Sequence, residues 1–426
     1  MTGAATWFGD GLMERVRRKV QGGIERIESS PLATVELLRE RWVEASGGHP
    51  TEADESVHLR EALAWLERAQ DAAAGGVARG YSLALVPGLG TRGWQSAYPE
   101  TTGYIIPTLY AASWTEDRPW LAMRATRAAR WELTVQQPSG AIPAGMVGQG
   151  TAPAVFNTGQ VVFGWLVAER EVGDHAFGAA ADRACRWLAQ HLDADGHWRR
   201  GNSPYANAGA TLYNARTAWA LLAAGRQLSR PVYTQAGAMA LRAVVRAQID
   251  NGWFPDCCLT DPHHPLTHTL AYTIQGLLEG GLLLEDEQMI GAAARAANAL
   301  AIAIHEDGFL PGRFDRRWRP AVSWSCLTGT AQMANVWARL GAFTGDAHWN
   351  APATAALTFL KRTQNRSSTD PGLRGGIKGS HPCTGEYGRL QTLSWATKFF
   401  VDALLRHRTG LEGYGRDRVA DCLALA

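Results

Sequence analysis

The sequence predicts an all-α protein in which six helical hairpins close into an (α/α)6 toroid. The first observation behind this prediction is a repeat: glycine-containing turns recur, and each is followed by an apolar helix. These helices begin at Gly103, Gly159, Ala215, Ala271, Ala331 and Ala396, so their starts lie 56, 56, 56, 60 and 65 residues apart. A nearly fixed period of this size specifies one supersecondary unit per repeat. The chain shows neither the alternation of apolar and polar residues that is typical of β-strands nor an alternation of strands with helices.

The second observation is a contrast between the two helices of each repeat. Arg124, Arg127 and Arg130 form a stripe at three-residue spacing on one first helix, which predicts a face in contact with water. The second helix from Gly159 to Ala168 has no charged residue, which predicts that it is enclosed on every side. An outer ring of half-exposed helices around an inner ring of buried helices is the layout of an (α/α)6 toroid.

The chain divides into an N-terminal helical arm, residues 1–52, and a barrel domain, residues 53–426. In Leu12–Ile27 and Leu32–Ala45, basic and apolar residues alternate at helical spacing, which predicts two amphipathic helices. Two roles for the arm are open, contact with a membrane surface and packing against the outside of the toroid. We expect the second.

The composition limits which binding partners and which cellular compartment are expected. The net charge of +2 gives no electrostatic case for binding nucleic acid. The sequence contains no run of about 18 uncharged apolar residues, so it predicts no membrane-spanning helix. The start, MTGAATWFGDGLMERVRRKV, lacks the apolar core of a signal peptide, and the six cysteines show no disulfide framework. These features predict a cytoplasmic protein and leave its oligomeric state open.

The loops that lead into the inner helices are long and hold many histidines, acids and tryptophans, whereas the loops that leave them are short. Function tends to reside in such long loops. We therefore predict a pocket where the inner helices begin. Six helix N-termini would converge there and would favour an anionic ligand, such as a sugar with a carboxylate.

Residues in these loops and at the starts of the inner helices carry side chains that can donate or accept protons. His268 and Tyr272 are four residues apart and share one helix face. A carboxyl group, an imidazole and a phenol that converge can move protons at a sugar carbon or oxygen. Structural roles stay open: Glu100 as a helix N-terminal charge, and His268 as a helix cap. The predicted catalytic residues are Glu100, Asp256, Asp261, His268, Tyr272, Asp315 and Glu386.

Aromatic and polar side chains in the same stretches are candidates for substrate binding. The flat rings among the 17 tryptophans suit the faces of sugars, and Arg313 suits an anionic group. The predicted substrate-binding residues are Tyr104, Asn157, Tyr213, Trp253, His263, Arg313, Trp318, Trp324 and Tyr387. Paired carboxyl groups would indicate glycoside hydrolysis, whereas a Tyr or His base beside a substrate carboxylate would indicate an epimerase or lyase.

Four segments carry a resemblance to a known family: PETTGYIIPTL, PLTHTLAYTIQGLLEGG, SCLTGTAQMANVW and GGIKGS with WATKFFVDAL. They resemble bacterial proteins encoded with polysaccharide-biosynthesis genes, a family of six-hairpin glycosidase-like toroids. The resemblance spans about Tyr98–Leu404. It implies a carbohydrate-active enzyme with a sugar or oligosaccharide substrate, and it leaves hydrolysis, epimerisation and elimination open. We expect no cofactor.

A second resemblance gives a competing prediction. Lanthionine cyclases are helical toroids that hold zinc with two cysteines and a histidine, and Cys326, His381 and Cys383 lie at comparable places here. The cyclase pattern has an adjacent Cys-His pair, whereas this chain has His381-Pro382-Cys383. The alternatives are thus a zinc-dependent, cyclase-like enzyme and a toroid that binds glycans without catalysis.

Overall fold

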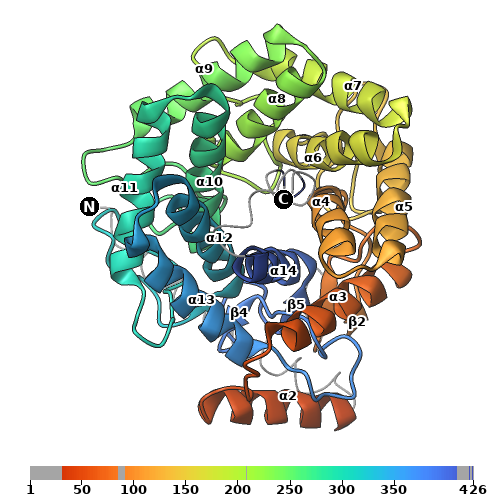
Figure 1. The fold of residues 1–426 in the computed structure, drawn as a ribbon, viewed down its shortest axis with the longest axis vertical. Coiled ribbons are helices and arrows are strands. Elements are labelled where there is room, and N and C mark those ends of the chain that lie inside the picture. Colours follow the sequence, from red (N-terminus) through yellow and green to blue (C-terminus); the bar gives the residue numbers. More distant parts are fainter. Residues whose placement is uncertain (1–30, 85–91, 208, 410–421, 423–424, 426) are drawn as a thin grey trace, which may run out of the picture.

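The computed structural model describes residues 31–84, 92–207, 209–409, 422 and 425. Within these residues, α-helices alternate along the chain between an inner and an outer ring (Figure 1). The inner helices are α4 (Pro99–Thr115), α6 (Val155–Val172), α8 (Ala215–Gln227), α10 (Thr267–Leu284), α12 (Leu327–Thr344) and α14 (Ser394–Thr409). The outer helices are α3 (Glu55–Asp71), α5 (Pro119–Val135), α7 (His175–His191), α9 (Pro231–Ala247), α11 (Glu287–Ala303) and α13 (Asn350–Thr363).

Each inner helix packs against the next, and α14 returns to pack against α4, so the inner ring closes. The predicted (α/α)6 toroid is therefore confirmed. The inner helices begin within four residues of the predicted starts, for example at Pro99 rather than Gly103. Two short 3-10 helices, η1 (Leu212–Asn214) and η2 (Ala347–Trp349), lead into α8 and α13.

Close packing of the inner ring depends on small residues. A Cβ atom on Gly103 of α4 would lie 2.5 Å from the Cα atom of Val161 on α6. A Cβ atom on Gly164 of α6 would lie 2.4 Å from the carbonyl oxygen of Gly103. The two helix backbones touch at this point, and any side chain there would force them apart. The apolar inner helices can thus form a ring without internal voids.

Short β-strands join loops that are far apart in the sequence, a feature that the repeat pattern did not predict. Strands β2 (Gly93–Trp94), β1 (Gly80–Ser82) and β5 (Gln391–Leu393) form an antiparallel sheet in that order. Strands β3 (Ser325–Cys326) and β4 (Ser380–His381) form an antiparallel pair. The first sheet fastens the first hairpin to the sixth, where the ring closes.

The arm helix α2 (Pro31–Ala45) lies outside the ring, beside the loop that follows α13 (Figure 1). The predicted helix at 32–45 is thus present, whereas the one predicted at 12–27 lies outside the described residues. Lys378 of the sixth hairpin is buried against α2 and pairs with Glu40 and, at 3.2 Å, with Glu44. Among the described residues, no helix is long and apolar enough to span a membrane.

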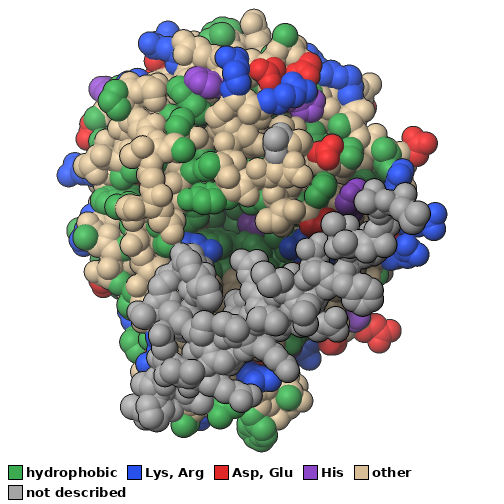
Figure 2. Space-filling model, turned by 180° about the vertical axis from the view of Figure 1, so that it is seen from behind, with side chains coloured by type: hydrophobic (Ala, Val, Ile, Leu, Met, Phe, Trp, Pro, Cys, Tyr) green, Lys and Arg blue, Asp and Glu red, His purple; other side chains and the backbone are tan. Residues whose placement is uncertain are grey.

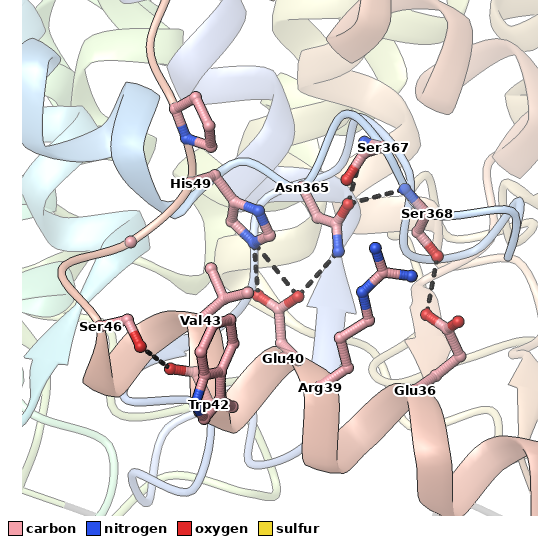
Figure 3. A pocket seen from close by; sticks show the side chains of 12 residues that line it. Glu36, Arg39, Glu40, Trp42, Val43, Ser46, His49, Asn365, Ser367 and Ser368 are labelled. Atoms are coloured by element: carbon pink, nitrogen blue, oxygen red, sulfur yellow. Dashed lines mark hydrogen bonds and ion pairs between the residues drawn. The ribbon is translucent and has the colours of Figure 1, made fainter.

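Further polar contacts complete the junction of the arm with the barrel. Glu40 also contacts the His49 ring at 3.1 Å and accepts a hydrogen bond of 2.8 Å from Asn365 (Figure 3). Burial raises the pKa of Glu40, but the Lys378 charge and the His49 contacts outweigh it and hold the pKa well below its usual range. Burial also raises the pKa of Glu44, but the Lys378 charge, the His381 side chain and the Cys383 backbone N–H outweigh it and lower that pKa to about 2. The arm is therefore attached by ion pairs that are hidden from water.

We predict that replacing Lys378 with methionine loosens the arm. Glu40 and Glu44 would stay buried without their cation, at a cost of about 3–5 kcal/mol in the free energy of unfolding. Hydrogen exchange of the α2 amides should accelerate and urea unfolding should shift to lower urea. Lys361→Met, which removes a lysine from a less buried pair with Glu55, is the matched control and should cost less. Unchanged exchange of α2 in Lys378→Met would contradict this role of the ion pairs.

A second prediction concerns Glu132 of α5, which is 0% exposed and has no hydrogen-bond partner among the described residues for either carboxyl oxygen. Burial raises its pKa well above the ordinary 4.5. The folded state therefore prefers protonated Glu132, and its stability falls as pH rises above about 4.5 towards the raised pKa. We expect Glu132→Met to stabilise the protein by about 1–3 kcal/mol at pH 8 and by less at pH 5. Urea unfolding at both pH values, with the exposed Glu306→Gln as control, tests this; equal effects at both pH values would argue against it.

Candidate active site

The second residue of each inner helix, counted for α8 from the start of η1, lies at the same level of the barrel. We call these six residues the mouth ring; they are Glu100, Phe156, Tyr213, His268, Thr328 and Trp395. Their aromatic rings point inward: that of Phe156 on α6 lies 5.2 Å from that of Tyr213 in the mouth ring and 4.8 Å from that of Tyr272, which is two inner helices away on α10. The mouth ring therefore surrounds the barrel axis where the inner helices begin, which is the place where the sequence predicts a pocket.

One helical turn deeper lies a second layer, spaced four residues from the mouth ring. It consists of Tyr104, Gln160, Thr217, Tyr272, Gln332 and Phe399. The hydroxyl of Tyr272 on α10 lies 3.5 Å from that of Tyr104 on α4, which is on the opposite side of the ring. The rings of Tyr104 and Phe399 are 5.6 Å apart. Tyr104, Tyr272 and Phe399 therefore meet inside the barrel and close the site from below, whereas Thr217 packs against Gly159 of α6.

Arg216 of α8 forms a charged floor beneath these rings. Its Nε atom donates to Gln160 at 2.7 Å, and its Nη1 atom donates to Gln275. The guanidinium carbon lies 5.7 Å from the centre of the Tyr104 ring and 5.5 Å from that of Tyr272. The side chain is fully buried, so its positive charge acts on the groups above it through a medium that screens it weakly.

Glu100 is the carboxyl group of the mouth ring. It remains partly accessible, and the Tyr98 hydroxyl donates to its Oε2 atom at 2.6 Å. Loss of water raises the pKa of Glu100 to about 7, although the Tyr98 hydrogen bond and the charges of Arg79 and Arg216 lower it. Near neutral pH Glu100 can therefore either donate or accept a proton, which suits a general acid or base.

His268 lies across the barrel from Glu100, on α10. Its Nδ1 atom is 2.7 Å from the Gln332 carbonyl oxygen, and burial lowers its pKa to about 4. The imidazole is therefore neutral, and the hydrogen on Nδ1 leaves the lone pair on Nε2. Its ring packs 4.4 Å from that of Tyr272 and 5.2 Å from that of Tyr387. His268 thus presents a fixed hydrogen-bond acceptor.

Arg79, just before β1, adds a cation to the Glu100 side of the mouth. Its Nη1 atom donates to Gln95 at 2.9 Å and to Gln391 at 2.6 Å. Its guanidinium carbon lies 4.9 Å from the centre of the Trp395 ring, which belongs to the mouth ring. The sequence reasoning missed Arg79, because sheet β2–β1–β5 brings it to the site from the loop of the first hairpin.

The sequence reasoning also missed Phe156, Thr328 and Trp395 of the mouth ring. The signal was present, because Glu100, Tyr213 and His268 were predicted and the missing residues occupy equivalent places in the repeat. Aligning the six inner helices at their second residue would have identified them.

The carboxyl groups predicted in the loops make local contacts instead of joining Glu100. Asp261 accepts from the backbone N–H groups of His263 and His264 and contacts the His264 ring at 3.1 Å. Asp315 accepts from the backbone of Arg317 and Arg319 and pairs with the Arg319 guanidinium at 2.7 Å. No hydrogen bond or ion pair between described residues connects these two acids with the mouth ring.

The other two predicted loop acids are exposed. Asp256 adopts a left-handed backbone conformation, with φ of 50°, at an exposed turn. Glu386 has a side chain that is 70% exposed and lies 3.7 Å from Arg313. Arg313 also donates to the His264 carbonyl oxygen at 2.7 Å. Because Tyr387 follows Glu386 and contacts His268, this group forms a rim above the His268 side of the mouth.

The aromatic and amide side chains that were predicted to bind substrate lie in different parts of the structure. Trp324 lies in the rim, 6.0 Å from the Arg313 guanidinium. Trp253 is 4% exposed and packs 5.1 Å from Trp318, so little of its ring is open to a sugar. Asn157 donates to the Pro143 carbonyl oxygen at 3.0 Å and is buried. His263 is exposed in the Asp261 turn.

The candidate zinc ligands do not form a metal-binding cluster in the described part of the chain, which has no group of three or more His, Cys, Asp or Glu side chains suited to an ion. Burial raises the pKa of the Cys326 thiol to about 12, and that of Cys383 to about 12. Thiols held in this protonated form are poor ligands. His381 faces Glu44 of the arm at 3.7 Å.

One face of the molecule is hollowed near its centre (Figure 2). Figure 2, seen from the side opposite to Figure 1, shows a hollow near the centre of the molecule in which hydrophobic side chains predominate. Basic, acidic and histidine side chains are visible at its edge. A recess that is mostly apolar with a few charged groups is typical of small-molecule sites.

We predict that Tyr98→Phe raises the pKa of Glu100 above about 7. The Tyr98 hydroxyl stabilises the carboxylate form, so its removal should favour the protonated form. Infrared difference titration of the carboxyl band, assigned with Glu100→Gln, measures this pKa. Tyr205→Phe, which changes a tyrosine that is 57% exposed, should leave the titration unchanged. A Tyr98→Phe titration that moves to lower pH would refute the assigned hydrogen bond.

No protein-family model matches the chain, and no curated protein sequence is similar to it. Solved structures are similar. An unsaturated glucuronyl hydrolase from Bacillus sp. GL1 matches with a TM-score of 0.64 at 16% identity, covering 84% of this chain and 98% of that one. One specific for heparin gives 0.63 at 17% identity, with coverage of 82% and 95%. One from Streptococcus agalactiae gives 0.60 at 13% identity, with coverage of 84% and 93%. The chain therefore shares the fold of the unsaturated glucuronyl hydrolases.

Proposed function

We propose that the chain is a carbohydrate-active enzyme that uses Glu100 as a general acid on a saccharide bound in the mouth. One observation carries this proposal: a carboxyl group whose pKa is raised to about 7 stands where six inner helices begin. The rings of Phe156, Tyr213 and Trp395 are buried beside it and keep water away from the acid. A perturbed acid in a recess of this kind is a typical functional site.

The charge of the mouth indicates a saccharide that carries a uronic acid. Arg79 and Arg216 are both close enough to lower the pKa of Glu100, and the inner helices direct their positive ends to the same place. The solved structures with this fold are named as unsaturated glucuronyl hydrolases, and the Bacillus enzyme is described as responsible for degradation of glycosaminoglycan. This part of the proposal rests on fold analogy together with the charge of the site.

In the proposed reaction, the protonated Glu100 gives its proton to the sugar and becomes a carboxylate. The Tyr98 hydroxyl, already 2.6 Å from Oε2, donates to that carboxylate, and the two arginine charges stabilise it. Across the mouth, the lone pair of His268 Nε2 accepts a hydrogen bond from a sugar hydroxyl or a water molecule. Donor and acceptor thus stand on opposite walls, which suits orientation of a nucleophile towards a protonated sugar.

The loop carboxyl groups stay in the proposal as candidate partners for Glu100. Hydrolysis of a saturated glycoside needs two carboxyl groups, on either side of the bond that is cleaved. Asp256, Asp261, Asp315 and Glu386 are the predicted sources of the second one. The association with polysaccharide biosynthesis and the cytoplasmic location also remain predictions.

We predict that Glu100→Gln lowers turnover of uronic-acid oligosaccharides by about 100- to 10,000-fold, since the amide cannot donate the acidic proton. Product release from glycosaminoglycan and other uronide oligosaccharides, followed by chromatography, is the measurement. Circular dichroism and the melting temperature should show an intact fold, and the exposed Glu306→Gln should behave as wild type. Full turnover by Glu100→Gln would eliminate the proposed acid.

The loop acids are tested in the same assay with Asp256→Asn, Asp261→Asn, Asp315→Asn and Glu386→Gln. A loss as large as that of Glu100→Gln in one of them would identify the second carboxyl group. Tight binding of saccharides without any product in the wild type would instead favour a glycan-binding toroid.

A further inference from the structure

The guanidinium group of Arg79 has one edge that the protein does not use. Both of its hydrogen bonds to described residues come from the single Nη1 atom, which donates to the side-chain carbonyls of Gln95 and Gln391. Its Nε and Nη2 atoms have no partner among these residues, and the side chain is partly accessible. Those two atoms form the pair of parallel donors that binds a carboxylate in a bidentate way.

The surroundings hold this edge in place. The Arg79 backbone N–H donates to the Ser96 carbonyl oxygen at 3.0 Å, and its carbonyl oxygen accepts from Ser394 at 3.1 Å. Gln95 is fixed in turn, because it donates to the Ser82 hydroxyl at 2.8 Å. With the Trp395 ring 4.9 Å away, the guanidinium is supported on several sides. Such an arginine is preorganised for a planar anion.

Within the part of the chain that the structure describes, the charge of Arg79 lacks a fully ionised partner nearby. The groups that interact with it electrostatically are Tyr98, Tyr387, Glu100 and Tyr104. The three tyrosines are neutral, because burial raises their pKa values well above 10. Glu100 is only partly ionised near neutral pH. A desolvated cation is unfavourable unless it is paired, so an anionic ligand would relieve this cost.

We propose that Arg79 binds the carboxylate of a uronic acid through Nε and Nη2, and that this ion pair keeps Glu100 protonated while the saccharide is bound. The inference rests on the proposed function and identifies how the site would recognise its substrate. Binding of the substrate would then also affect the protonation of Glu100, since the Arg79 cation acts on both the substrate carboxylate and Glu100.

The direction of this coupling follows from the charges around Glu100. The Arg79 charge lowers the pKa of Glu100, so its neutralisation by a carboxylate should raise that pKa above about 7. The other cation, Arg216, is fully buried and keeps its charge. Tyr98, Tyr104, Tyr213 and Tyr272 also interact electrostatically with Glu100 and stay neutral. A neutral sugar would leave Arg79 cationic and Glu100 partly ionised, so only a uronide would fully protonate the acid.

The first test is calorimetric titration with methyl β-D-glucuronide and methyl β-D-glucoside. The wild type should bind the glucuronide about 10- to 100-fold more tightly, the range for a hydrogen bond to a charged group. Arg79→Gln should weaken only the glucuronide and thereby abolish the preference. Arg79→Lys keeps the charge without the paired donors and should give an intermediate result. Arg39→Gln, which removes an exposed arginine of the arm, is the matched control and should keep the preference.

The second test follows the Glu100 carboxyl band by infrared titration. In the wild type, glucuronide should move the titration to higher pH and glucoside should not. Arg79→Gln should raise the Glu100 pKa without a ligand, and glucuronide should then have no further effect. A glucuronide preference that survives Arg79→Gln, or a Glu100 titration that glucuronide does not move, overturns the inference.

The two proposals fail in different ways. If uronide oligosaccharides are turned over and Arg79→Gln weakens both glycosides equally, the Arg79 inference is wrong and the proposed function stands. If the wild type neither binds these glycosides nor turns over any saccharide, the proposed function is wrong and the Arg79 inference fails with it.

Discussion

Exclusion of water from the start of the inner helices is the constraint on which both the fold and the site depend. The inner ring closes because its helices are mostly buried along their length and touch at residues such as Gly103 and Gly164. Polar side chains at the mouth must then find partners among themselves, as Tyr98 does with Glu100 and His268 does with Gln332. Desolvation disfavours the charged form of each group, so it raises the pKa of Glu100 and lowers that of His268. One physical cause thus produces both a proton donor and a neutral acceptor.

The closure of the ring also connects the arm with the site. Lys378, which the arm neutralises through Glu40 and Glu44, lies in a segment that bonds to β5: the Gly379 N–H donates to the Gln391 carbonyl oxygen at 3.0 Å. The side chain of Gln391 in turn accepts from Arg79. Buried ion pairs at the edge of the molecule therefore support the strand that positions the cation of the mouth. The arm therefore helps to position Arg79, although it lies outside the ring of helices.

The sequence was informative wherever the repeat determines the structure. Helix positions followed from the period and from the missing charges, and Glu100, His268 and Tyr272 were found because they occupy the first turns of inner helices. Arg79 could not be found in this way, because the first and sixth hairpins meet through a sheet between strands about 310 residues apart. The role of the loop acids could not be predicted for another reason. Asp261 and Asp315 accept hydrogen bonds from backbone N–H groups of their own turns, and the sequence does not distinguish such an acid from one that faces a ligand.

In the proposed function, the chemistry of the mouth ring favours giving a proton over taking one from carbon. Epimerisation or elimination beside a carboxylate requires a base strong enough to remove a carbon-bound proton. His268 has a pKa lowered to about 4, which makes it a weak base, and burial raises the pKa of Tyr272 so that its phenolate is disfavoured. Glu100 as a carboxylate would be the strongest base in the mouth ring, but pairing of Arg79 with a uronide would favour its protonated form. The same electrostatics that would recognise a carboxylate would therefore direct the site towards protonation of the sugar, with His268 orienting the group that attacks.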